Sequence, residues 1–370
     1  MSVYITMTIF AVLFSALANI KDYKKTENSK FRINIKLVFW YLSELVLIIV
    51  AAIRYDVGQD YMYTYVPFFN GVLWGNINEN IEVGFLLLNK VVQIFTQDYA
   101  GIFIICSVIF FHYIYKAIRD QSPMPTLSIF LLVGTTYYFI FLNAMRQMMA
   151  VAIFLYAIKF IQERKLVKYL IYMVIASTIH ASALILIPLY FLYGIKLRPI
   201  KVLGILAVFM AIKPIITKII LKVIEATKYN YYIDSKFNTQ DVGYIVLAIN
   251  IVVLIFSMIY LKKSDKSEKK EKKDLEEQKK YSFYCLLQLI STIIAWYDGA
   301  VPLLNRIRWG TGISVIILIP YIIKQEKNAK LRLLYTFIII LAYTLYTLYT
   351  IGINNANSVL PYMTIFQRGG

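Results

Sequence analysis

Cysteine and histidine are scarce in this chain of 370 residues, which has only two of each. Cys106 and Cys285 both lie inside apolar runs, so the sequence predicts no disulfide framework. The histidines and cysteines show no metal-ligand spacing, and the acids form no D-x-D pair. Asp56 and Asp60 stand in a D-x-x-x-D pattern, which is only a weak indication of a divalent-ion site. We therefore predict no metal site and no cofactor.

Several other signals are missing as well. The sequence has no P-loop, no G-x-G-x-x-G fingerprint and no nucleophile elbow. The first twenty residues lack a basic n-region and a small-residue cleavage site, so we expect them to form a first span rather than a removable signal. Acids number 21 against 39 basic residues. In a soluble protein this imbalance would suggest nucleic acid, but in a membrane protein it marks the cytoplasmic loops, so we expect no nucleic-acid partner.

Long apolar runs are abundant, because 59% of the residues are hydrophobic and 16% are charged. A helix needs about 20 residues to cross the roughly 30 Å hydrocarbon layer of a membrane. Runs of suitable character lie at 2–20, 34–53, 100–118, 125–142, 145–161, 169–195, 200–224, 242–261, 281–297, 309–323 and 333–352. This pattern predicts an all-α, polytopic membrane protein, with a break between two crossings near Asn143 and Arg146.

The run 169–195 is long for one span and short for two, and the distribution of charge decides between these readings. If the chain goes in and comes back with His180 near the apex, every basic loop lies on one face. These loops hold 28 of the 39 basic residues, and the positive-inside rule makes their face cytoplasmic. The loops are 21–36, 116–120, 159–168, 196–201, 262–280 and 324–332.

The resulting architecture is a single integral membrane domain, residues 1–370, with about twelve transmembrane or re-entrant helices and both termini outside. Residues 54–99 form an extracytoplasmic loop in which 82–97 has the spacing of an interfacial helix. The lysine-rich segment 262–280 forms a charged cytoplasmic loop.

Four arginines are expected on the outer face, at or near helix ends. Arginine at a membrane edge is costly unless it faces a protein interior or a wet cavity, so such residues are functional candidates. A single arginine there is equally explained by snorkelling to headgroups. Four together favour phosphate or pyrophosphate, which a membrane protein meets on lipid carriers. They are Arg54, Arg146, Arg306 and Arg308.

Acids and one histidine accompany these arginines. Asp60, two residues after a glycine that permits a tight turn, is the better candidate for a general base, whereas Asp56 is expected to pair structurally with Arg54. His180 is expected to transfer a proton or hold a phosphate, although a lone histidine on an apolar helix usually only packs. Three further acids are Asp298 and, more loosely, Glu82 and Asp241. The aromatics of the outer loop, Tyr61 among them, suit either sugar stacking or membrane anchoring.

Two stretches of the sequence resemble the EpsG family. "RYDVGQDYMYTY" resembles the family's R-Y-x-V-G-x-D-Y-x-x-Y signature. Residues 141–192 resemble its central block, with an N-x-x-R-Q start at Asn143, Arg146 and Gln147 and an H-x-S turn at His180. "LLNRIRWG" and "NSVLPYM" fit its C-terminal third more loosely. One position departs, since the family often has a small hydroxyl residue where this chain has Gln59.

The resemblance implies a Wzy-like polymerase of exopolysaccharide or capsule loci, with a fold like that of C-type glycosyltransferases. It implies polymerisation of polyprenyl-pyrophosphate-linked oligosaccharide repeat units at the outer face of the bacterial cytoplasmic membrane. Expected partners are this lipid-linked substrate, membrane lipids and other assembly proteins such as a flippase and a chain-length regulator. The motif match carries a functional expectation to Arg54, Asp60, Arg146 and His180.

For such a polymerase we expect the four arginines to clamp the pyrophosphate, either Asp60 or His180 to act as the base, and the other to position substrate. Asp56, Tyr61, Asn143, Gln147 and Asp298 are expected to support them. A lipid-linked oligosaccharide flippase would place its basic residues along a path through the bilayer, and a polysaccharide O-acyltransferase would direct its histidine to the cytoplasm. A non-catalytic scaffold is a further alternative.

Overall fold

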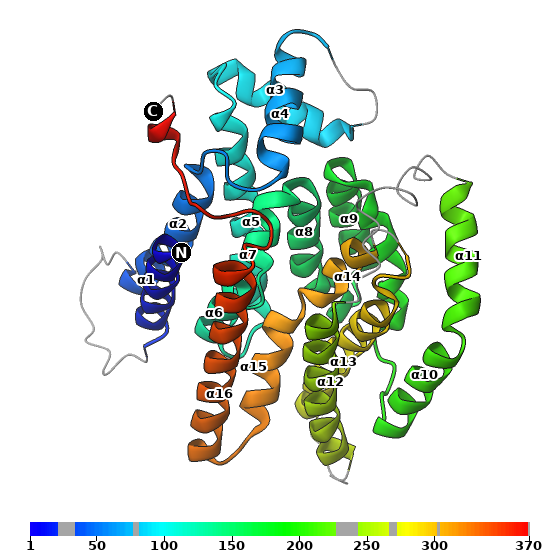
Figure 1. Ribbon diagram of the computed structural model, residues 1–370. Helices are drawn as coiled ribbons and strands as arrows, with labels where there is room; N and C mark the ends of the chain where they lie inside the picture. The colour runs from blue at the N-terminus through cyan, green and yellow to red at the C-terminus, as the bar shows by residue number, and fades with distance from the viewer. Residues whose placement is uncertain (21–33, 77–80, 227–242, 266–271, 302–303, 369–370) are drawn as a thin grey trace. The chain divides into compact units, whose positions relative to one another are not determined.

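The chain folds into helices in every part that the structure describes (Figure 1). This structure is a computed structural model, and it describes residues 1–20, 34–76, 81–226, 243–265, 272–301 and 304–368. In these ranges the β pairing is one isolated antiparallel bridge between Arg54 and Thr364. The predicted all-α class is therefore confirmed. The helices form two compact units, Met1–Ile187 with Glu326–Gly370, and Pro188–Gln325.

The first unit contains the N-terminal helices and the C-terminal segment. Its α-helices are α1 (Ser2–Ala18), α2 (Ile35–Ala52), α3 (Val66–Leu73), α4 (Val83–Phe95), α5 (Ala100–Gln121), α6 (Pro125–Gly134), α7 (Tyr137–Asn143), α8 (Met145–Gln162), α9 (Leu166–Ile179) and α16 (Ala329–Thr347). Two π-helices, η1 (Tyr61–Tyr65) and η4 (Leu348–Ile353), and the 3₁₀ turn η5 (Ile365–Gln367) join them. The 3₁₀ helix η2 (Ala181–Leu192) starts in this unit and ends in the second.

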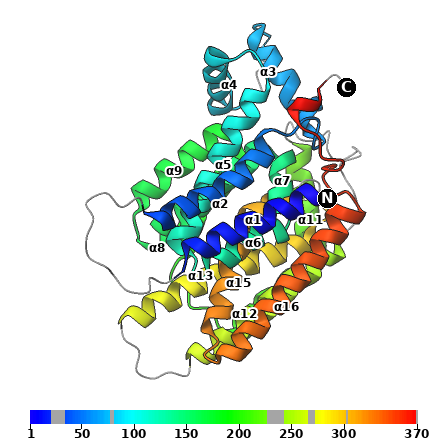
Figure 2. The same ribbon diagram turned by 90° about the vertical axis from the view of Figure 1, so that its left-hand side faces the viewer.

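In the first unit, each helix of the series α1, α2, α5, α8 and α9 packs against the next one, as Figure 2 shows for α1, α2 and α5. Helix α2 contacts α1 and α5, α5 contacts α8, and α8 contacts α9. The Ser43 hydroxyl of α2 donates to the Ala11 carbonyl of α1 at 2.6 Å, which ties two apolar helices by a buried polar contact. Phe110 of α5 stacks on Phe141 of α7 with ring centroids 4.1 Å apart. α8 is buried on nearly all sides and forms the centre of this unit.

The helix ends follow from local sequence. The Asn34 side chain caps α2 by accepting from the Leu37 amide at 3.3 Å, and Asn328 caps α16 in the same way. Helices α6 and α7 meet at an angle of 52°, where Thr136 has a φ of +66°. The predicted break near Asn143 is confirmed, because α7 ends at Asn143 and α8 begins at Met145.

The second unit consists of α10 (Pro199–Ala211), α11 (Lys213–Glu225), α12 (Tyr244–Asp265), α13 (Lys272–Tyr297), α14 (Leu304–Gly312) and α15 (Val315–Gln325). Helix α12 packs on α13 and α15, and α13 also packs on α14. Tyr281 of α13 donates to the Ser257 carbonyl of α12 at 2.8 Å. Gln288 of α13 donates to the side chain of Asn250 at 3.0 Å, so α12 and α13 are joined by polar contacts in an apolar interface.

Within the described ranges, four helices are long and apolar enough to span a membrane, or seven if each of three bent pairs counts as one span. The four are α2, α5, the first part of α12, and α16 with η4. Several predicted spans correspond to shorter helices, such as α1 and α9. The chain is thus a membrane protein by length and composition of its helices, while the expected number of about twelve stays a prediction.

Several segments differ from the sequence-based expectation. The runs 125–142 and 309–323, each expected as one span, contain the bent junctions of α6 with α7 (52°) and of α14 with α15 (41°). The run 200–224 was expected as one span, but α10 and α11 meet at 64° because Pro214 follows the junction and cannot continue the hydrogen-bond pattern of α10. Within the expected loop 262–280, the described residues 262–265 and 272–280 are helical, since α12 extends to Asp265 and α13 starts at Lys272. Lysine and glutamate favour helix, and Glu276–Lys279 is one of two ion pairs at helical spacing there.

Candidate functional site

Arg146 lies in the first turn of α8, beside the start of α4 and the end of α9. Its Nη1 donates to Glu82 Oε2 at 2.8 Å, and its guanidinium lies 5.4 Å from the centre of the Phe85 ring. The other carboxylate oxygen, Glu82 Oε1, accepts from the Ala181 amide at 3.0 Å. One carboxylate therefore joins the N-terminal turn of α8 to the residue that follows His180.

His180 stands where the chain reverses. Helix α9 ends at Ile179, His180 is extended, and η2 begins at Ala181. The Tyr169 hydroxyl donates to the Leu186 carbonyl at 2.7 Å, so the chain after His180 returns along α9. The break and the reversal predicted at His180 are both present.

The hydrogen bonds of His180 define its neutral tautomer. Its Nδ1 accepts from the Ser182 amide at 3.2 Å and lies 2.9 Å from the Ser182 hydroxyl. Because an imidazole nitrogen that accepts from an amide cannot carry a proton, the neutral ring carries its proton on Nε2. His180 is therefore arranged to donate a hydrogen bond through Nε2.

Asp60 is held to the same region through Asn143, the last residue of α7. The Asp60 amide donates to Asn143 Oδ1 at 3.4 Å, and the Tyr65 hydroxyl donates to the Asn143 carbonyl at 2.8 Å. Burial raises the pKa of the Tyr65 phenol; the Asp60 carboxylate raises this pKa further and Arg146 lowers it. The Asp60 carboxylate and Arg146 therefore act in opposite directions on the same phenol.

Gly58 permits the approach of this loop to α7. Its φ is +97°, and a Cβ at this position would lie 2.8 Å from both the Leu142 carbonyl and Asn143 Oδ1. Only glycine fits both the backbone conformation and the space. The tight turn predicted before Asp60 is confirmed, and the contact with α7 gives it a second reason.

Arg54 is fully buried, with an exposed fraction of 0%. Its guanidinium donates to the Ala51 carbonyl and, at 3.4 Å, to the Leu142 carbonyl, and it lies 4.8 Å from the centre of the Phe103 ring. Burial lowers the pKa of this guanidinium, and neighbouring tyrosines, Tyr61 first, oppose the shift. The predicted contact of Arg54 with pyrophosphate stays a prediction, and it requires this packing to open.

The ion pair expected between Arg54 and Asp56 is not formed. Asp56 is exposed with a φ of +50°, whereas Arg54 is enclosed by carbonyls and aromatic rings. Within the described ranges, no carboxylate lies within salt-bridge distance of Arg54. The two residues separate because the chain turns sharply between the end of α2 and Gly58.

The remaining supporting residues of the first unit are buried. Tyr61 stacks on Phe103 with ring centroids 4.0 Å apart, so its ring is committed to packing rather than open for a sugar. Gln147, next to Arg146, is 3% exposed.

The C-terminal residues 354–368 cover the loop that carries Asp60, as the red segment beside the end of α2 shows (Figure 1). Asn143 Nδ2 donates to the Asn357 carbonyl at 2.7 Å, and the Gly58 amide donates to the Ser358 carbonyl at 2.9 Å. The motifs "RYDVGQDY" and "NSVLPYM", about 300 residues apart in the chain, are thus direct neighbours.

Arg368 fastens the end of this segment. Its Nη1 lies 2.8 Å and 2.9 Å from the two carboxylate oxygens of Asp98, and its guanidinium lies over the Tyr99 ring. Partial burial raises the pKa of the Asp98 carboxyl, but the Ala100 amide and Arg368 outweigh it and hold this pKa below its ordinary value. The ion pair of Asp98 with Arg368 is therefore charged at neutral pH.

The other predicted residues belong to the second unit. Arg308 Nε donates to Asp298 Oδ2 at 2.9 Å, and both side chains are nearly buried. Burial raises the pKa of the Asp298 carboxyl, although Arg308 acts to lower it. Arg306 lies on the same helix as Arg308, α14, and is half-buried. Asp241 lies outside the described residues.

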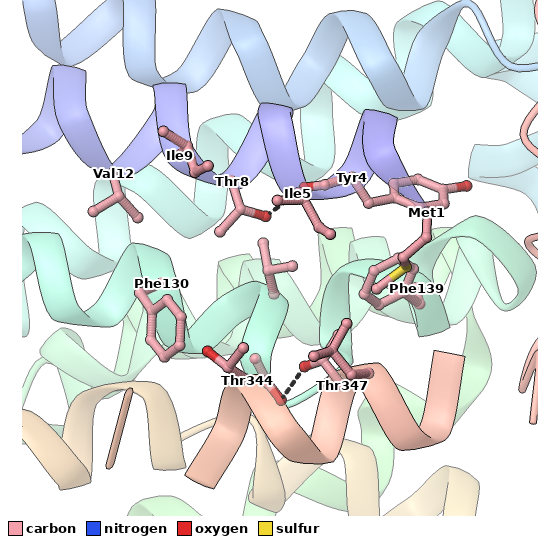
Figure 3. Close-up of a pocket in the computed structure, with 13 residues that line it drawn as sticks. Met1, Tyr4, Ile5, Thr8, Ile9, Val12, Phe130, Phe139, Thr344 and Thr347 are labelled. Carbon is pink, nitrogen blue, oxygen red and sulfur yellow. Dashed lines mark hydrogen bonds between the residues drawn. The ribbon is translucent and has the colours of Figure 1, made fainter. Parts of the chain in front are cut away.

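A cavity of about 250 Å³ lies between α1, α6 and α16 in the first unit (Figure 3). Its lining carries no charged side chain, and the Thr8 and Thr347 hydroxyls donate to the carbonyls of Tyr4 and Gly134. None of the predicted site residues lines it. The cavity is therefore separate from the charged site.

Comparison with protein-family models gives one match, to the EpsG family over residues 37–364. The chain belongs to the EpsG family. The EpsG match begins within α2 and includes every predicted site residue, which confirms the resemblance seen in the motifs. Searches of curated proteins and of solved structures found no match. EpsG membership indicates a role in polysaccharide biosynthesis.

Two contributors to this EpsG-family site were missed or underrated in the sequence. Glu82 was noted only as a loose member of the acids, because nothing in its surroundings points to Arg146, 64 residues later. Arg368 was not noted at all, since its partner Asp98 is 270 residues away. The only signal in the local sequence was that Glu82 is a single acid directly before an amphipathic helix. Among the described residues, no group of three or more His, Cys, Asp and Glu could hold a metal.

Proposed function

We propose that this EpsG-family protein is a polysaccharide polymerase, a glycosyltransferase that joins polyprenyl-pyrophosphate-linked oligosaccharide units. The observation that carries the proposal is the convergence of Asp60, Arg146 and His180 at one end of the first unit. They come from three separate stretches of sequence. The Asp60 amide donates to Asn143, three residues before Arg146, and Glu82 joins Arg146 to the amide of Ala181, the residue after His180. Transfer of a sugar from a pyrophosphate requires a carboxylate that can act as a base, a permanent cation and a hydrogen-bond donor.

In the proposed reaction, a hydroxyl oxygen of one repeat unit attacks the anomeric carbon of the chain attached to the other lipid. The bond between that carbon and the pyrophosphate oxygen breaks, and polyprenyl pyrophosphate leaves. Negative charge grows on the leaving oxygen in the transition state, so a guanidinium beside it accelerates the reaction instead of only binding substrate. Arg146 is the arginine we assign to this oxygen, because it is partly exposed, at 22% of its side chain.

Asp60 is assigned as the base that takes the proton of the attacking hydroxyl. His180 is the weaker candidate for this task, since the neutral ring carries its proton on Nε2 and its Nδ1 accepts from Ser182. His180 is instead suited to donate to a phosphate oxygen. Direct displacement in line inverts the configuration of the anomeric carbon, and the charge supplied by arginine lets the reaction proceed without a metal.

We also assign Arg54 to the pyrophosphate clamp, whereas the predicted part of Arg306 and Arg308 of the second unit in it stays a prediction. Arg54 donates to the carbonyl of Leu142, the residue before Asn143, and so connects to the part of the chain that leads to Arg146. We place the site at the outer face of the bacterial cytoplasmic membrane with both termini on that side, as the distribution of basic loops favours. Membrane lipids, a flippase and a chain-length regulator are the proposed partners.

Replacement of Arg146 by alanine tests the function. In cells that depend on this protein for polymer, Arg146→Ala should leave single lipid-linked repeat units accumulated on the outer leaflet. Arg119→Ala is the matched control, because Arg119 is also in an ion pair but lies in the last turn of α5. Accumulation on the inner leaflet would favour a flippase, and unchanged polymer would contradict the role of Arg146.

A further inference from the structure

Glu82 occupies a position between two groups that bind anions. One of its oxygens lies 2.8 Å from Arg146 Nη1 and the other lies 3.0 Å from the Ala181 amide nitrogen. A guanidinium and a backbone amide at the start of a helical segment are common ligands of phosphate oxygens. Each oxygen of the Glu82 carboxylate thus meets one donor, as two oxygens of a phosphate group would.

The backbone around Glu82 brings the carboxylate to this position. Glu82 is the extended residue directly before α4, and Gly84 in the first turn of α4 touches α9. A Cβ on Gly84 would lie 2.7 Å from the Thr178 carbonyl oxygen, so only glycine lets the two helices come this close. Glu82 is therefore held against Arg146 and Ala181 by the packing of α4 on α9.

The ion pair of Glu82 is open enough for exchange. Its side chain is 20% exposed and that of Arg146 is 22% exposed, compared with 13% and 12% for the pair of Asp298 with Arg308. An ion pair that water reaches contributes little net stability, whereas a buried one is costly to separate. A competing anion therefore has to replace Glu82 in a pair that water partly reaches, not in an enclosed one.

We propose that Glu82 is an internal anion that holds Arg146 and the Ala181 amide in place while the site is empty, and that a phosphate group of the substrate displaces it. The identity of the displacing group rests on the proposed function, in which the substrate carries a pyrophosphate. Ala181 thereby becomes a phosphate ligand through its backbone amide. Glu82 sets the affinity of the site for pyrophosphate by competing with it.

Binding of inorganic pyrophosphate to the purified protein in detergent tests this role. Glu82→Gln keeps an oxygen for the Ala181 amide but removes the competing charge, so it should bind pyrophosphate about fivefold more tightly than the wild type. Arg146→Gln should lose the binding. Asp120→Asn is the matched control, because it removes one charge from an exposed ion pair with Lys159 at 2.7 Å, and its affinity should equal that of the wild type.

The inference is overturned if Glu82→Gln binds pyrophosphate no more tightly than the wild type, or if neither protein binds it. A gain equal to that of Asp120→Asn would also overturn it, since the effect would then be one of net charge. Polymer formation is measured separately in cells. Tighter binding by Glu82→Gln together with normal polymer in cells lacking the protein would refute the polymerase and leave the anion exchange standing.

Discussion

Replacing Gly58 by alanine should disable the site although it removes none of its charged groups. A φ of +97° costs alanine about 1 to 2 kcal/mol relative to glycine. The new Cβ would also stand 2.8 Å from the Leu142 carbonyl and from Asn143 Oδ1, so the loop or the end of α7 has to move. Together we expect a loss of about 3 kcal/mol in the free energy of unfolding.

Gly75→Ala is the matched control for this prediction. Gly75 also has a positive φ, +77°, but a Cβ there would meet no atom within 4 Å. It should therefore lose only about 1 kcal/mol. The difference of about 2 kcal/mol corresponds to about 4 to 8 °C in the midpoint of thermal unfolding, at 2 to 4 °C per kcal/mol for domains of 150 to 250 residues.

The assays are thermal unfolding of the purified proteins and gel analysis of polymer from cells. Gly58→Ala should unfold at the lower temperature and make no long polymer, because the displaced loop carries Asp60 away from Asn143. Gly75→Ala should make polymer of normal length. Equal unfolding temperatures and equal polymer for the two variants would refute the claim that the contact of Gly58 with α7 positions Asp60.

Three further predictions concern the surroundings of the site. Arg54→Lys should lower the unfolding temperature, since one ammonium cannot reach both carbonyls that Arg54 pairs and an unpaired buried carbonyl costs about 1 to 3 kcal/mol; an unchanged midpoint would contradict this. Because the pKa of Asp98 is lowered in the folded state, its contribution is present above pH of about 4 and is lost as pH falls through the folded-state value. The protection factors of residues 354–368, which correct for the slower intrinsic amide exchange in acid, should therefore fall as the pH is lowered, and Asp98→Asn should show low protection factors already at neutral pH; protection factors unchanged by both would contradict a role of the Asp98–Arg368 ion pair in fastening this segment. Treating the purified protein with EDTA should leave polymer formation intact, and loss of activity that manganese restores would refute a metal-independent reaction.

The sequence predicted most of the helices, since apolar runs of the required length have few alternatives in a membrane protein. Charge counting also predicted the reversal at His180, which no local propensity indicates. It did not predict the bend before Pro214, because the apolar run continues through it. It also did not predict helix at residues 262–265 and 272–280, which were assigned to a loop from their charge.

The site was predictable only as a set of residue types. Arg54 illustrates the limit, because its position at the end of an apolar run is the same whether it is buried or faces a cavity, and packing on Phe103 decides between them. The contacts of Glu82 and Arg368 could be found only from the fold, because each residue pairs with a residue far along the chain. Local sequence cannot encode such contacts.

Synthesis by the purified protein in liposomes tests the central claim most directly. Wild-type protein and Asp60→Asn would each receive polyprenyl-pyrophosphate-linked repeat units, and the products would be separated on a gel. The account predicts a ladder of polymer with release of polyprenyl pyrophosphate from the wild type and single units only from Asp60→Asn. No ladder from the wild type, or an equal ladder from Asp60→Asn, would contradict it.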